Sequence, residues 1–195
     1  PLAHGSREND IGVLGMTKKL VSLLVVCLIA SLSAASSVQA QNRPTRDGFW
    51  FSGGLGYGSL GCDNCGGSRE GGLSGGLSLG GTITPRFLVG VGTSGWTKSQ
   101  DGATLTVGEI DARIRFYPST TGGFFITGGL GVGSVTGSSS GISATETGSG
   151  GILGMGYDIR IARNTSVTPY WNGYAMKNSN TDANVGQVGV AITLH

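Results

Sequence analysis

The chain has 195 residues, of which 38 are Gly, and its 13 Lys and Arg nearly balance its 11 Asp and Glu. No basic cluster is present to follow a phosphate backbone, which excludes a nucleic-acid-binding surface. Beyond residue 40, no stretch approaches the roughly 18 continuous apolar residues that a spanning helix needs. A chain of this kind can cross a membrane only as a closed barrel, because an open strand edge has no hydrogen-bond partner in lipid.

The N-terminal segment has the features of a secretory signal peptide. Residues 16–40 contain Lys18 and Lys19, an apolar run from Leu20 to Leu32, and a small-residue site that ends at Ala40. The apolar run is too short for a retained membrane anchor. We therefore expect Sec-dependent export with cleavage after Ala40. Residues 1–15 are then an upstream extension outside the mature protein, 41–48 a periplasmic lead-in, and 49–195 a β-barrel.

The rest of the chain shows apolar side chains alternating with Gly, Ser, Thr or charged residues, which is the period of a strand with two unlike faces. This pattern predicts eight strands near residues 49–60, 71–83, 87–97, 103–118, 123–135, 151–161, 166–176 and 185–194. Most are close to the roughly 9–11 residues that a tilted transmembrane strand requires. The predicted fold is an all-β, eight-stranded antiparallel up-and-down barrel.

The fourth strand decides which face points toward lipid. One face carries Ile110, Ile114 and Phe116, and the other carries four charges in succession. Turning its two arginines toward lipid would cost roughly 4–8 kcal/mol, comparable to the stability of a whole domain. We therefore expect a polar, side-chain-filled lumen without a wide pore. Its structural charge cluster should consist of Glu109, Asp111, Arg113, Arg115, Asp158 and Arg160.

The connections between the predicted strands alternate in length. Short turns follow the second, fourth and sixth strands, whereas longer polar segments, including residues 61–70 and 136–148, follow the others. Short periplasmic turns opposite longer external loops are typical of outer-membrane barrels. Five aromatic residues beside the short turns predict a periplasmic-side girdle: Phe49, Phe51, Phe87, Phe116 and Phe124.

Sites for metal, cofactor or catalysis are not expected. Cys62 and Cys65 lie in the first long segment without a following helix pattern, which favours a local disulfide over a metal or redox site. Two Gly-x-Gly-x-x-Gly matches do not open a helix, and no nucleotide cofactor is expected. His195, at the far end of the chain, is poorly placed to serve a Ser–His hydrolase. Glu109 could form a catalytic acid pair with Asp111, but the adjacent arginines favour a structural role.

The signal peptide, the alternating strands and the unequal connections together resemble the small outer-membrane β-barrel superfamily of the OmpA/OmpX type. The resemblance covers residues 49–195 and is one of pattern, without a specific motif. It implies an integral protein of the bacterial outer membrane, surrounded by lipid. Members of this superfamily act as envelope scaffolds, adhesins, evasion factors or minor channels, and a few are lipid-modifying enzymes.

Three functional hypotheses follow. The first is a non-enzymatic envelope barrel that contacts surfaces or protein ligands through residues 61–70 and 136–148. The second is a narrow channel for ions or small solutes. The third is a secreted soluble barrel that carries an apolar ligand, which would require Ile114 inside the barrel and Arg113 outside.

Overall fold

The structure is a computed structural model that describes residues 46–62, 69–100, 102–139, 142–179 and 182–195. The predicted signal peptide and its cleavage site lie outside the described residues. Within the described residues, the helices and strands are all strands, joined by turns: β1 Phe49–Cys62, β2 Glu70–Thr84, β3 Phe87–Gln100, β4 Ala103–Phe116, β5 Phe124–Ser139, β6 Ile142–Tyr157, β7 Ile159–Ala162, β8 Thr165–Lys177 and β9 Asp182–Leu194. None of the described segments is a helix of the length and hydrophobicity needed to cross a bilayer.

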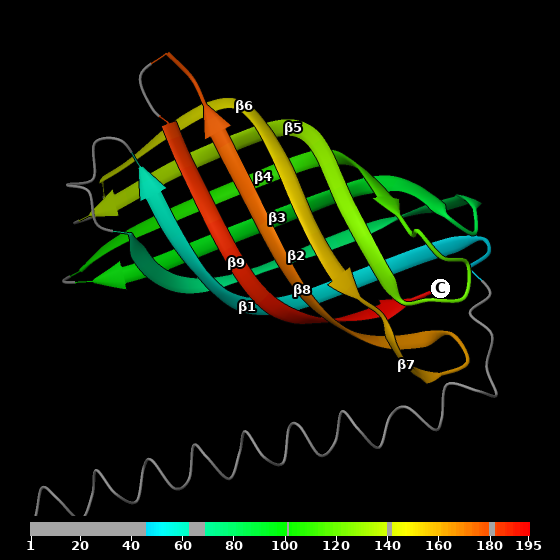
Figure 1. The fold of residues 1–195 in the computed structure, drawn as a ribbon. Coiled ribbons are helices and arrows are strands. Elements are labelled where there is room, and N and C mark those ends of the chain that lie inside the picture. Colours follow the sequence, from blue (N-terminus) through cyan, green and yellow to red (C-terminus); the bar gives the residue numbers. More distant parts are fainter. Residues whose placement is uncertain (1–45, 63–68, 101, 140–141, 180–181) are drawn as a thin grey trace, which may run out of the picture. The chain divides into compact units, whose positions relative to one another are not determined.

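The strands close into a barrel (Figure 1). From β1 to β6 each strand pairs antiparallel with the next, β6 pairs with β8, and β9 pairs with both β8 and β1. The short β7 continues the line of β6 beyond Asp158, so the closed barrel has eight strand positions, as the sequence predicted. We call the end at which β1 begins and β9 ends the turn end, and the opposite end the hairpin end.

The interruption at Asp158 is a difference from the single strand predicted at residues 151–161. Instead of continuing the ladder, the backbone N–H of Asp158 donates to the carbonyl of Gly123 at 2.9 Å. Asp is disfavoured within strands, and the carboxylate of Asp158 accepts hydrogen bonds inside the barrel end.

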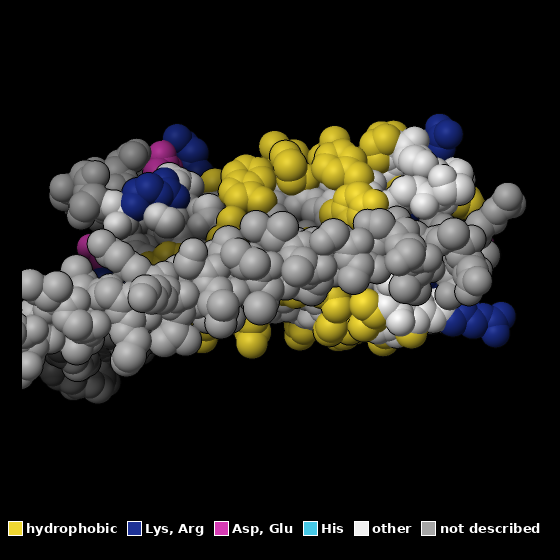
Figure 2. All heavy atoms as spheres, turned by 60° about the horizontal axis from the view of Figure 1, so that its bottom comes forward, with side chains coloured by type: hydrophobic (Ala, Val, Ile, Leu, Met, Phe, Trp, Pro, Cys, Tyr) yellow, Lys and Arg dark blue, Asp and Glu magenta, His cyan; other side chains and the backbone are white. Residues whose placement is uncertain are grey.

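The two faces of the barrel have the predicted orientation. Leu130 is 79% exposed on the outer surface, whereas Arg113 is only 6% exposed in the lumen. Hydrophobic side chains form a band on the outer surface, with Lys and Arg at its two ends (Figure 2). The hypothesis of a secreted soluble barrel is therefore wrong, because Ile114 is on the outside and Arg113 on the inside.

The predicted loop at residues 136–148 is a second difference, because these residues extend a hairpin. β5 and β6 remain paired up to Ser139 opposite Ile142, and the hydroxyls of Thr136 and Thr145 lie 2.9 Å apart across the two strands. Thr and Ile favour strands, and this local preference prevailed over the loop-like Ser and Gly content. In the described residues, β8 accompanies β6 only as far as Ser149 opposite Lys177, so the hairpin extends beyond its neighbour.

The predicted sorting of connections by length is wrong. Residues 117–123 join β4 to β5 at the turn end, while only residues 101–102 and 140–141 join the strand pairs β3–β4 and β5–β6 at the hairpin end. The other predicted loop, residues 61–70, is shortened at both ends by β1 and β2, and its residues 63–68 lie outside the described ranges. The asymmetry of the barrel therefore comes from the length of its strands, since β3 to β6 project at one end.

Candidate functional site

Three of the four charges of β4 form a compact ion-paired group in the middle of the lumen. Nε of Arg113 donates to Oδ1 of Asp111 at 2.9 Å, and a second guanidinium nitrogen lies 2.5 Å from Oδ2. Glu109 is farther away, with a carboxylate oxygen 3.9 Å from Arg113. All three side chains are at least nine-tenths buried. A bidentate Arg–Asp pair of this kind is rigid, and its net charge is small.

Arg115 lies in a different environment from Arg113. Its guanidinium carbon is 4.1 Å from the ring centroid of Phe125 and 4.7 Å from that of Trp50. Contacts between a desolvated guanidinium and aromatic faces contribute about 2 kcal/mol each. Arg115 is thus packed against aromatic rings, and it interacts electrostatically with the carboxylate of Asp158.

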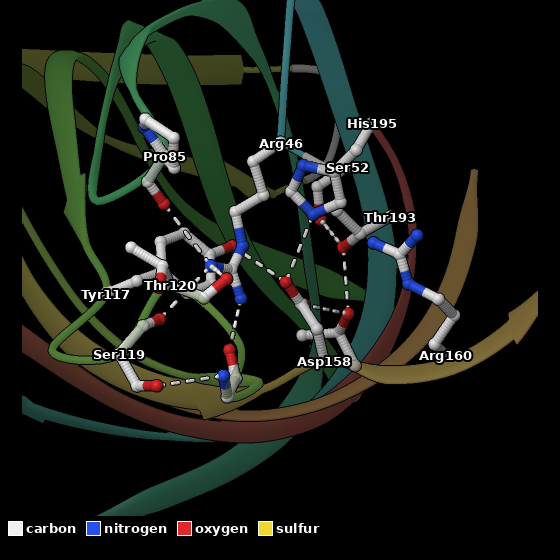
Figure 3. Close-up of polar contacts among 12 residues, drawn as sticks. Arg46, Ser52, Pro85, Tyr117, Ser119, Thr120, Asp158, Arg160, Thr193 and His195 are labelled. Carbon is white, nitrogen blue, oxygen red and sulfur yellow. Dashed lines mark hydrogen bonds and ion pairs between the residues drawn. The ribbon is translucent and has the colours of Figure 1, made fainter. Parts of the chain in front are cut away.

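Arg46 closes the turn end of the lumen, and sequence analysis missed it. Its guanidinium lies 3.5 Å from the centre of the Tyr117 ring and donates to the carbonyls of Pro85, Ser119, Thr120 and Gly122 (Figure 3). The side chain is only 1% exposed. Burial lowers the pKa of Arg46, while Tyr117 and Asp158 act in the opposite direction. Arg46 therefore ties the segment before β1 to the connections β2–β3 and β4–β5.

Asp158 is the centre of a second hydrogen-bonded group at the turn end. Its carboxylate accepts hydrogen bonds from the hydroxyls of Tyr117 and Thr168, each at 2.7 Å, and lies 3.1 Å from Nε2 of His195 (Figure 3). The Thr168 hydroxyl is 2.8 Å from that of Thr193, which is 2.9 Å from that of Ser52. This hydroxyl series crosses β8, β9 and β1 and therefore links the strands where the barrel closes.

Arg160 does not join the charges of β4. One of its guanidinium nitrogens donates to the backbone carbonyl of Arg163 at 2.5 Å, at a half-buried position near the turn end. The six predicted charges are thus divided in the structure. Glu109, Asp111 and Arg113 form one group, Arg115 interacts with Asp158, and Arg160 lies apart from the β4 charges. Arg160 shares the inward parity of Asp158, but it lies on β7 at the rim of the barrel.

Apolar side chains fill the lumen at two levels. Toward the hairpin end, an apolar layer is formed by Leu60, Trp96, Val107, Ile152, Tyr174, Ala183 and Val185. Toward the turn end, a smaller cluster contains Trp50, Leu88, Tyr117 and Phe125. Between these levels lies a cavity of about 40 Å³, lined by Ser, Thr, Tyr, Asn and Gln side chains together with Arg113 and Arg115. That space is enough for about one water molecule. The side chains of the two apolar levels are at most 5% exposed, which indicates that they fill the lumen on either side of the cavity.

The remaining predicted positions lie on the outer surface or outside the described ranges. The five Phe side chains occur at strand ends near the turn end, where the rings of Phe87 and Phe116 are 4.8 Å apart. Cys65 lies outside the described residues, as does the proposed disulfide. Within the described part of the chain, no group of three or more His, Cys, Asp or Glu side chains has the arrangement of a metal site.

Comparison with known proteins identifies the family. The model of the outer membrane protein beta-barrel domain matches residues 27–193. The chain belongs to this family. It is thus an outer-membrane β-barrel protein, in agreement with the outward hydrophobic band. No match was found among curated proteins.

Solved structures of other outer-membrane proteins have a similar fold. Neisserial surface protein A superimposes with a TM-score of 0.59 at 13% identity, covering 75% of this chain and 96% of that protein. Ail, the attachment invasion locus protein of Yersinia pestis, gives a TM-score of 0.55 at 13% identity, with 77% and 100% covered. A complex of Ail with the heparin analogue sucrose octasulfate gives 0.54 at 13% identity, with the same coverage. At these identities the likeness concerns the fold alone.

Proposed function

We propose that the protein is a non-enzymatic, non-conducting barrel of the bacterial outer membrane that acts through contacts made at its hairpin end. The observation that carries this proposal is the double closure of the lumen. A channel would need a continuous polar path, whereas this lumen contains an apolar layer, ion-paired charges, and Arg46 stacked on Tyr117. No observation favours the channel hypothesis. The part of the barrel that projects farthest is the hairpin end of β3 to β6, and this is the surface that we propose makes the contacts.

The proposed orientation places the turn end in the periplasm and the hairpin end outside the cell. The lead-in and the end of β9 both lie at the turn end, as expected for an exported chain with an even number of strand positions. This proposal includes removal of residues 16–40, so that the mature protein starts at Gln41. Intact-mass measurement of the protein extracted from outer membranes tests it, and a retained 16–40 segment would contradict it.

The chemistry of the hairpin end suits contacts with polar surfaces. The projecting strands carry many Ser and Thr side chains, and residues 142–147 are all exposed. Two ion pairs lie at this end of the barrel, Lys98 with Glu70 and Lys177 with Asp182 at 3.0 Å. A surface of this kind provides hydrogen-bonding groups without a strong net charge, which suits polar or glycosylated partners outside the cell.

Planar-bilayer recording tests the closed lumen. We expect no conductance steps from the wild-type barrel, and none from Trp96→Ala, because the turn-end cluster still closes the lumen. Opening both levels, with Trp96→Ala, Arg46→Ala and Trp50→Ala combined, should produce small steps if that variant retains its folded, heat-modifiable gel migration. Regular conductance steps from the wild type would reinstate the channel hypothesis.

Adhesion of bacterial cells that display the protein tests the surface role. The informative variant lacks residues 137–144 and joins the shortened β5 and β6 through a two-residue Asn-Gly turn, which leaves the transmembrane part unchanged. We expect this variant to adhere less to a glycosylated protein coat than the wild type does. Equal adhesion at equal surface expression would contradict the proposed role of the hairpin end.

A further inference from the structure

The lipid-facing surface is not uniformly covered by large side chains. Near the hairpin end it contains a groove of about 500 Å³ that crosses β5, β6, β8 and β9. Leu130, Leu153 and Trp171, all exposed, stand beside a floor that includes Gly173 and Gly186. A second groove of about 630 Å³ shares Leu130 and Leu153 with the first and continues across β5, β4 and β3.

The glycines in the floor of the first groove are not required by packing within the barrel. A Cβ atom on Gly173 would meet its nearest neighbour, Trp171, at 3.6 Å, and one on Gly186 would meet Arg69 at 3.8 Å. By contrast, a Cβ on the lumen-facing Gly131 would collide with the carbonyl of Ile110. The barrel would therefore accept side chains at Gly173 and Gly186, and their absence keeps the groove open to its surroundings.

Arg69 lies at the hairpin-end margin of this groove. Its Nε donates to Oγ of Ser59 at 3.0 Å, one terminal nitrogen to Oδ1 of Asn184 at 2.8 Å, and the other to the carbonyl of Ser59 at 2.5 Å. These neutral oxygens fix the position of the exposed guanidinium without neutralising its charge. Asp182, on the same face of β9, is ion-paired with Lys177.

We propose that the groove and Arg69 together bind a phosphorylated, multiply acylated glycolipid of the outer leaflet, the chemistry of lipid A. A phosphate lies on the fixed guanidinium, and one acyl chain lies over Gly173 and Gly186 against Trp171. An Arg guanidinium matches a phosphate through two parallel hydrogen bonds, and a basic side chain beside a hydrophobic span is the usual arrangement for an anionic headgroup. The assignment to the outer leaflet rests on the orientation given under Proposed function.

The charge of Arg69 distinguishes this occupant from the alternatives. A second copy of the barrel would place an identical guanidinium opposite the first or bury it against apolar side chains, which is unfavourable. A bulk phospholipid would fill the groove without a defined position. Only an amphiphile with an anionic group at the level of Arg69 can both pair with the guanidinium and cover the apolar floor of the groove.

The test measures binding of defined lipids to the purified, folded barrel in detergent by native mass spectrometry. The probes are bisphosphorylated lipid A, the same lipid without its phosphates, and phosphatidylglycerol. Arg69→Gln removes the cation, and Gly173→Leu fills the groove. Arg86→Gln, in the β2–β3 turn, and Gly108→Leu are matched controls, because Gly108 lies outside both grooves and has no atom closer than 3.8 Å to an added Cβ.

We expect the wild type and both controls to bind one lipid A, and Arg69→Gln and Gly173→Leu to bind it about tenfold more weakly. Removing the phosphates should weaken binding to the wild type but not further to Arg69→Gln. Equal binding by all variants, equal binding of phosphatidylglycerol, or a lipid-free dimer would overturn the proposal. Because the measurement involves neither conductance nor adhesion, its failure would leave the proposed function standing.

Discussion

The lumen is closed in two chemically different ways, and their difference shows what each kind of closure requires. The apolar layer toward the hairpin end is held by packing, and its only polar groups are the indole of Trp96, which donates to the carbonyl of Gly58 at 3.1 Å, and the hydroxyl of Tyr174. The charged levels below it depend on electrostatic partners, because a buried charge without a partner is costly. Substitutions should therefore act through voids in one region and through stranded charges in the other.

The largest expected effect comes from stranding a charge. Arg113→Leu leaves the buried Asp111 without its bidentate partner and should lower the free energy of unfolding by about 3–5 kcal/mol. Urea titration of the barrel in lipid vesicles measures this loss. The double variant Asp111→Asn with Arg113→Leu should recover much of it, and unchanged stability of the single variant would show that the pair is unimportant.

A void in the apolar layer should cost less. Trp96→Leu removes part of a large buried side chain and leaves the carbonyl of Gly58 without its indole donor, which should reduce stability by about 2 kcal/mol. The same vesicle titration provides the measurement. Tyr57→Leu is the matched control, because Tyr57 is an aromatic residue exposed toward lipid. If the two variants lost equal stability, the apolar layer would have no special role.

Arg46→Ala should have an intermediate effect, about 1–2 kcal/mol, because it removes a cation–π contact and hydrogen bonds to turn carbonyls but also removes its own buried charge. The connections at residues 85–86 and 117–123 should then become more accessible to protease added at the turn end. Arg46→Lys should not restore protection, because an ammonium cannot stack and reach several carbonyls at once. Full protection in Arg46→Lys would show that charge alone is sufficient.

The smallest effect is expected at Arg160. Since its guanidinium donates to the Arg163 carbonyl at the rim of the barrel and lies near the like charge of Arg46, Arg160→Gln should change stability by less than about 0.5 kcal/mol. Comparison with Arg113→Leu in the same titration separates two residues that the sequence placed in one cluster. A loss of several kcal/mol in Arg160→Gln would mean that Arg160 belongs to the buried charge network.

The faces of the barrel were predictable because side chains alternate strictly along a strand, and the cost of placing Arg113 in lipid fixes which face is inside. The same alternation also places Trp50, Trp96 and Phe125 inward, and following it through these aromatic residues would have indicated the closure of the lumen. The strand break at Asp158 and the contacts of Arg46 could not be derived this way. They depend on partners brought together by closure of the barrel, which local periodicity does not contain.

The position of Arg46 also has a consequence for the order of assembly. Its acceptors belong to the connections β2–β3 and β4–β5, which are 39 and 73–76 residues farther along the chain. Arg46 can therefore reach its final contacts only after those two connections have come together. Although Arg46 precedes the first strand, it thus completes its interactions late in folding. Formation of its contacts at the turn end therefore indicates that the segments from β2 to β5 have already folded.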